Sequence, residues 1–147
     1  MPSQLDSARI DQLVEHYRPN KWSIVQKKSH AKGGDGSCSY PRRTIYVPPV
    51  VDDYSFFVYL HEVAHATNRT DKPGHQDEYL AERWAMSEFR NIGVRVTREI
   101  LRQAKHNVLG HVIRDRKKNI AIDPAVWKWV DPNAPTRDKA RYRRRIA

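Results

Sequence analysis

The chain of 147 residues contains a single cysteine, Cys38, so it cannot form an internal disulfide. One cysteine also excludes a zinc ribbon, which needs several cysteine ligands. The sequence has no run of 18 apolar residues that would span a membrane, and its first residues do not resemble a signal peptide. Together these absences predict a protein of the reducing cytoplasm.

Acidic residues are scarce compared with basic ones, 17 against 27, which gives a formal net charge of +10. A chain of this length fits one domain, and the composition becomes tail-like after residue 130. We therefore expect a single domain over residues 1–130 and a basic tail over residues 131–147. The tail is the predicted binding surface for DNA or RNA phosphates, with a second basic cluster at residues 114–118. Its basic residues are Arg137, Lys139, Arg141, Arg143, Arg144 and Arg145.

Hydrophobic periodicity and capping residues predict more helix than strand. Helices are expected over residues 3–17, 53–67, 75–91, 97–114 and 124–130, and strands over residues 22–26 and 44–47, with a loop over residues 27–39. Two prolines follow the second strand and end it. The pattern predicts an α+β fold in which a small, mostly antiparallel sheet packs on the helix at 53–67.

That helix carries the sequence Leu-His-Glu-Val-Ala-His at residues 60–65, an H-E-x-x-H pattern. Residues four apart lie one above the other on a helix, so His61 and His65 can share one Zn²⁺. Glu62 points to the side, where it can take a proton from a zinc-bound water that then attacks a peptide carbonyl. The pattern predicts the zinc site of a metallopeptidase.

A catalytic zinc normally has three protein ligands and an open position, so a third ligand is needed. Glu78 and Glu82 lie four residues apart on one predicted helix face, so one can bind zinc while the other accepts a ring N–H from a ligating histidine. His75, ten residues after His65, is a competing ligand. Another interpretation is that both glutamates only pair with surface arginines.

These residues resemble the compact zinc peptidases of the ImmA/IrrE type and related phage, plasmid and antirestriction (ArdC-like) proteins. The resemblance spans about residues 45–113 and depends on the H-E-x-x-H pattern and a downstream Glu78-x-x-Ala81-Glu82. It implies a zincin-like minimal metallopeptidase fold with His61, His65 and Glu78 as ligands and Glu62 as the base. Glu82 would then hold a ligating histidine.

The pair formed by Gly74 and His75 is also similar to SprT-like proteases, in which a histidine after a glycine is the third ligand. Those proteases are DNA-associated, and the cysteine zinc ribbon that they usually carry is missing here. The resemblance therefore leaves His75 as the alternative to Glu78.

The sequence as a whole predicts a zinc endopeptidase of narrow specificity, related to phage or mobile elements, that cleaves a protein substrate. The strand at 44–47 would lie at a sheet edge beside the metal and pair with an extended peptide, although it can equally be an ordinary edge strand. One alternative is a nucleic-acid-binding or anti-defence accessory protein with a structural or vestigial zinc site. Another is a different zinc hydrolase on the same scaffold.

Overall fold

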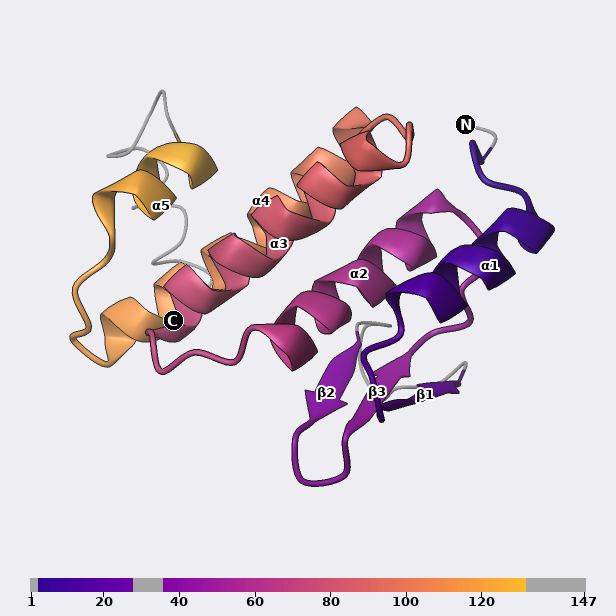
Figure 1. Ribbon diagram of the computed structural model, residues 1–147. Coiled ribbons are helices and arrows are strands. Elements are labelled where there is room, and N and C mark those ends of the chain that lie inside the picture. Colours follow the sequence, from indigo (N-terminus) through magenta and orange to yellow (C-terminus); the bar gives the residue numbers. More distant parts are fainter. Residues whose placement is uncertain (1–2, 28–35, 132–147) are drawn as a thin grey trace. The chain divides into compact units, whose positions relative to one another are not determined.

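The computed structural model describes residues 3–27 and 36–131, and Figure 1 shows their helices and strands. Within these ranges the chain forms five helices and one sheet of three strands, which confirms the predicted α+β class. The chain divides into two compact units. The first comprises Met1–Arg69 and Arg83–Val96, and the second comprises Thr70–Glu82 and Thr97–Ala147.

The first unit holds the sheet and the helix with the histidine motif. Its elements are α1 (Ser7–Tyr17), β1 (Ser23–Gln26), β2 (Ser37–Ser39), β3 (Thr44–Val47), α2 (Asp53–Thr67) and the C-terminal half of α3 (Gly74–Asn91). The strands predicted near residues 22–26 and 44–47 are confirmed. The loop prediction for residues 27–39 is wrong at β2, a Ser-Cys-Ser strand that has no apolar alternation and forms by pairing with β3.

The sheet has the strand order β1-β3-β2. Strands β2 and β3 are antiparallel because the four residues 40–43 join them as a hairpin, whereas β1 pairs with β3 in parallel. The sheet is therefore mixed, and the prediction of a mostly antiparallel sheet holds only for the β2–β3 pair. Strand β3 is central, with Ile45 and Val47 fully buried, so the expectation that residues 44–47 form an edge is wrong.

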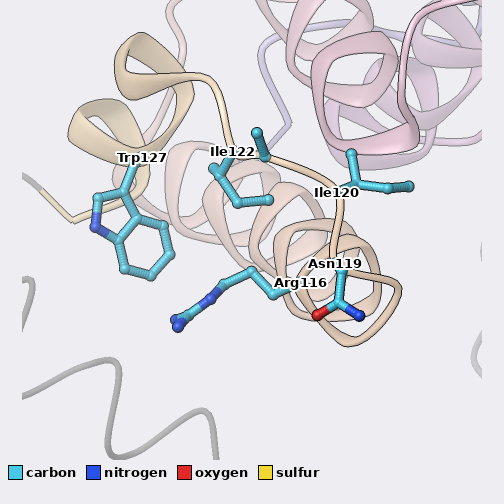
Figure 2. Close-up of a pocket in the computed structure, with 6 residues that line it drawn as sticks. Arg116, Asn119, Ile120, Ile122 and Trp127 are labelled. Atoms are coloured by element: carbon cyan, nitrogen blue, oxygen red, sulfur yellow. The ribbon is translucent and has the colours of Figure 1, made fainter.

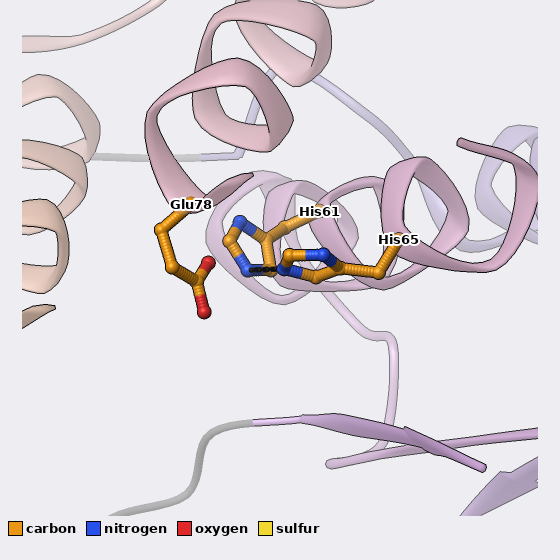
Figure 3. Close-up of side chains that lie close together, drawn as sticks. All are labelled: His61, His65 and Glu78. Carbon is orange, nitrogen blue, oxygen red and sulfur yellow. Dashed lines mark hydrogen bonds between the residues drawn. The ribbon is translucent and has the colours of Figure 1, made fainter. Parts of the chain in front are cut away.

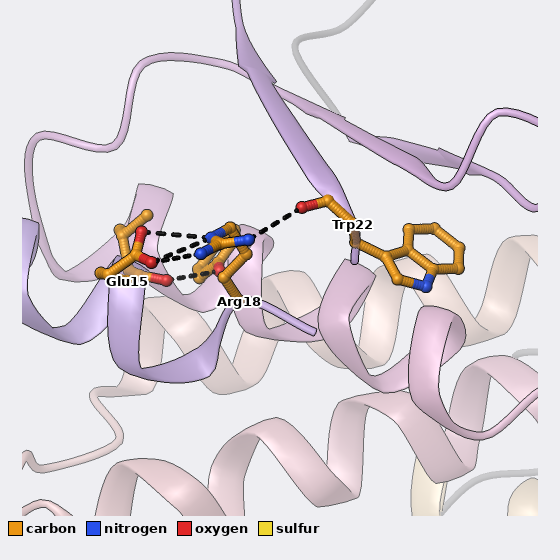
Figure 4. Close-up of polar contacts among 5 residues, drawn as sticks. Glu15, Arg18 and Trp22 are labelled. Atoms are coloured by element: carbon orange, nitrogen blue, oxygen red, sulfur yellow. Dashed lines mark hydrogen bonds and ion pairs between the residues drawn. The ribbon is translucent and has the colours of Figure 1, made fainter. Parts of the chain in front are cut away.

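Contacts at the end of α1 connect that helix to the sheet and to α2. Arg18 pairs with Glu15 on the last turn of α1 and donates a hydrogen bond to the Trp22 carbonyl at 3.2 Å, just before β1 (Figure 4). Hydrogen bonds from Arg18 hold the pKa of the exposed Glu15 carboxyl below its usual range. The Tyr59 hydroxyl of α2 donates to the Val14 carbonyl at 2.7 Å.

Helix α2 is fixed at its start by a capping box and along its length by burial. The Asp52 carboxylate accepts from the Ser55 amide at 2.8 Å, as expected from the aspartates at the predicted start. Phe56 and Leu60 are fully buried, and the Phe56 ring stacks on Phe89 of α3 at 5.9 Å. This packing places the next turn of α2, with the motif, beside the sheet, which α2 contacts through β2 and β3.

The second unit consists of the N-terminal half of α3, α4 (Arg98–Lys117) and α5 (Pro124–Val130). Thr97 caps α4 as predicted, although the helix extends beyond residue 114. Its core contains Val108 and Val112 of α4 and Val126 of α5, against which Trp127 and other half-buried side chains pack.

None of the helices in the described part of the chain is both long enough and apolar enough to cross a membrane. The predicted boundary between a domain at 1–130 and a tail at 131–147 stays a prediction. The predicted nucleic-acid-binding residues lie outside the described residues; they are Arg137, Lys139, Arg141, Arg143, Arg144 and Arg145.

Candidate metal centre

His61 and His65 lie one turn apart on α2, and their Nε2 atoms are 3.0 Å apart (Figure 3). Two zinc bonds to nitrogen of about 2.0–2.1 Å in a tetrahedral arrangement place the two nitrogens about 3.3 Å apart. The observed separation is close to that value, and both side chains are half-buried. The pair therefore has the geometry expected of two ligands to one ion.

Glu62 follows the first histidine and is only 5% exposed. Its side chain packs against the backbone at Gly36, just before β2, where a Cβ would lie 2.7 Å from the Glu62 Cγ and 3.0 Å from the Tyr46 carbonyl oxygen. Only a glycine leaves room for this approach. The sequence analysis missed Gly36, for which the only signal was its place in a glycine-rich segment.

Tyr40, in the hairpin between β2 and β3, holds the C-terminal end of α2. Its hydroxyl donates to the His65 carbonyl oxygen at 2.7 Å, and the Arg69 guanidinium lies 4.3 Å from the centre of its ring. Trp22 packs edge-on against the same ring at 6.0 Å. Tyr40 therefore connects the β2–β3 hairpin to the turn of α2 that carries His65. This role of Tyr40 was not predicted from the sequence.

In the second unit, α4 supplies polar partners to the two predicted glutamates. The Nε2 atom of His111 lies 3.1 Å from Glu78 Oε1. Asn107 donates to Glu82 Oε1 at 2.9 Å and, at the longer distance of 3.5 Å, to Glu78 Oε2. Asn107 and His111 were not singled out from the sequence, although their four-residue spacing matches that of the glutamates.

His75 is fully buried, and both of its ring nitrogens have partners within the second unit. Its Nδ1 lies 2.7 Å from Asp115 Oδ2, and its Nε2 accepts a hydrogen bond from the Asp123 amide at 3.0 Å. The His75 amide also donates to Asp115. Burial raises the pKa of the Asp115 carboxyl, but these hydrogen bonds from His75 outweigh it and lower the pKa. This arrangement favours Glu78 over His75 as a metal ligand.

One group of potential metal ligands in the described ranges comprises His61, His65 and Glu78. Each offers one ligand atom, and these atoms lie within 4.8 Å of one another (Figure 3). Two imidazole nitrogens and one carboxylate oxygen are a donor set that suits zinc. The predicted hydrogen bond from a ligating histidine to Glu82 stays a prediction.

Comparison of the chain with protein-family models, with curated proteins and with solved structures gave no match. The resemblance to the ImmA/IrrE type therefore stays a prediction drawn from the motif residues. The chemical interpretation of the site depends on the geometry of its own side chains.

Proposed function

We propose that this protein is a zinc-dependent metallopeptidase related to the ImmA/IrrE type, which hydrolyses a peptide bond in a protein substrate. The observation that carries the proposal is the arrangement on α2. His61 and His65 bring two ring nitrogens to within 3.0 Å, and the buried Glu62 lies in the same turn. Two imidazole nitrogens that converge in this way, with a carboxylate on the same turn, are the ligand pair and the proton acceptor of an H-E-x-x-H zinc site.

In this proposal His61, His65 and Glu78 would hold the zinc. When bound, zinc would lower the pKa of a water and polarise the substrate carbonyl. Glu62 would accept the proton of the attacking water and pass it to the leaving amine. His111 donates its ring N–H to Glu78 and so fixes the orientation of this carboxylate.

Strand β2 is the part of the sheet best placed to receive a substrate. It is an outer strand in the order β1-β3-β2, and Gly36 at its start touches Glu62. An extended peptide that pairs with β2 would bring its backbone next to the proton acceptor. The proposal therefore gives β2 the role that the sequence assigned to residues 44–47.

Metal content and cleavage products test this proposal together. The purified chain should contain about one zinc, the stoichiometry of a mononuclear site. A cell lysate incubated with it should yield new peptide termini that disappear after chelation and return when zinc is added. A chain that binds no zinc, or products that survive chelation, would contradict the proposal.

Gly36 provides a prediction about how Glu62 is positioned. In Gly36→Ala the new Cβ would lie 2.7 Å from the Glu62 Cγ, so the carboxylate must move. A displacement of about 1 Å at a reacting group costs on the order of 100-fold in rate, so we expect kcat to fall by about 10- to 100-fold while zinc content is unchanged. Steady-state kinetics on an identified substrate measure the effect.

Gly110→Ala on α4 is the matched control, because the nearest atom to the new Cβ would be 4.0 Å away. Alanine within a helix stabilises by about 0.5–1 kcal/mol relative to glycine, so this variant should keep full activity. Wild-type kcat in Gly36→Ala would show that the close contact does not position Glu62.

The accessory-protein alternative is favoured by the net charge of +10. Such a protein would have a zinc site but would not hydrolyse peptides. A variant that lacks the Glu62 carboxylate distinguishes the two functions, because it should inactivate a peptidase and leave an accessory protein active.

A further inference from the structure

A hollow of about 480 Å³ lies at the C-terminal end of α4, within the second unit and built from residues outside the proposed metal centre. Figure 2 shows the Arg116 side chain extending beside the Trp127 indole, with the side chains of Ile120, Ile122 and Asn119 around it. Its lining residues are Arg116, Asn119, Ile120, Ala121, Ile122 and Trp127. The volume is within the usual range for a small-molecule site.

The lining combines a flat aromatic ring with a cation. The Arg116 guanidinium carbon lies 5.9 Å from the centre of the Trp127 ring, and both side chains are half-buried. Trp127 packs on the core that contains Val126, which limits the motion of the indole. Asn119 is exposed and has φ 60°, the left-handed conformation that asparagine tolerates, where the chain turns out of α4.

The turn of α4 that borders this hollow is rich in positive charge. Arg114, Arg116 and Lys117 occupy the last turn of α4, and Lys118 caps it. The one acidic residue of the segment 114–118 is Asp115, which is buried and hydrogen-bonded to His75. Its carboxylate therefore faces the interior, and the outer surface of this turn presents cations.

We propose that this hollow binds a nucleotide unit of single-stranded nucleic acid, with the base on Trp127 and a phosphate on Arg116. Aromatic rings beside cations form the usual platform for unpaired bases, because every base has a face that can stack. In a duplex the faces of the bases are covered by their neighbours. An acidic peptide offers carboxylates to Arg116 but no ring to Trp127.

Binding by the full chain is measured by fluorescence anisotropy with a labelled ten-residue oligothymidylate across a salt series. A stacked base contributes about 1–3 kcal/mol, so we expect this oligomer to bind at least about fivefold more tightly than an abasic oligomer of the same length. A duplex of the same length and an acidic peptide should bind more weakly still. Competition by free thymidine monophosphate shows whether the site takes a free nucleotide as well as a strand.

Two variants distinguish the contribution of the base to binding from that of the phosphate. Trp127→Leu should weaken binding of oligothymidylate by about fivefold or more and leave binding of the abasic oligomer unchanged. Arg116→Ala should weaken binding of both and reduce the salt slope by about 0.7, the value for one lost phosphate contact on a single strand.

Arg98→Ala is the matched control because it removes the same charge from an exposed position at the opposite end of α4, about 27 Å from Arg116 at 1.5 Å per residue. Thermal melting shows whether each variant folds. If Trp127→Leu unfolds, the proposal is tested by the wild-type affinities for oligothymidylate and the abasic oligomer and by the Arg116→Ala variant. Equal binding of oligothymidylate and the abasic oligomer by the wild type would overturn the proposal, as would equal losses in Arg98→Ala and Arg116→Ala, or a peptide that binds as tightly as the strand.

Discussion

Glu62→Gln is expected to eliminate hydrolysis while the fold and the zinc content stay unchanged. A glutamine amide has the size of the carboxylate and can pack on Gly36 in the same way, but it cannot accept a proton at neutral pH. General base catalysis contributes about 10²- to 10⁴-fold, so kcat should fall by at least that range. Initial rates on an identified substrate measure the loss, with zinc analysis and circular dichroism on the same sample.

Glu99→Gln makes the same chemical change at an exposed position in the first turn of α4 and should retain wild-type rates. If the Glu62→Gln variant kept full biological activity, the peptidase proposal would be ruled out and the accessory-protein alternative would be favoured. Loss of zinc together with activity would instead place Glu62 among the ligands, so the metal analysis is part of the test.

Glu78→Ala and His75→Ala should have opposite effects. Loss of the proposed third ligand is expected to weaken zinc binding by more than about 100-fold, the upper range for groups that only support a ligand. Loss of His75 leaves the Asp115 carboxylate buried without the ring that contacts it at 2.7 Å. Leaving a buried acceptor without its donor costs about 1–3 kcal/mol of stability, and more when the acceptor is charged, whereas zinc binding by the folded fraction should change little.

Competition with a chromophoric chelator gives the zinc affinities, and urea denaturation of the metal-free chains gives the free energies of unfolding. Asp71→Ala, at an exposed position shortly before α3, serves as the control for a lost carboxylate. If His75→Ala lost zinc while Glu78→Ala kept it, the third ligand would be His75, as in the SprT-like pattern.

The helices were predictable because each carries its own boundary signals. Asp52 and Thr97 cap α2 and α4 as expected, and Pro124 begins α5. The H-E-x-x-H spacing likewise fixes two histidines on one helix face without any tertiary contact. These parts of the fold and of the site depend on residues close together in the sequence.

The remaining features depend on partners distant in the sequence. Strand β2 has no periodic signal and exists through its pairing with β3, and the parallel register of β1 is set by neither strand alone. Nothing local marks Gly36 as the residue that touches Glu62, or Asp115 as the partner that engages His75 across 40 positions. Such contacts are specified by packing, which a single sequence does not display.

If a peptide pairs with β2 and zinc binds His65 as proposed, the hydroxyl of Tyr40 links the two binding events thermodynamically. It connects the hairpin after β2 to the His65 carbonyl, so a peptide paired with β2 would also restrain the turn of α2 that bears the proposed ligand. Linkage is reciprocal: by whatever factor a bound peptide raises the zinc affinity, zinc must raise the peptide affinity. Tyr40→Phe deletes only the hydroxyl and leaves the residues of both sites unchanged. In this variant the factor by which each ligand raises the affinity for the other should fall toward one.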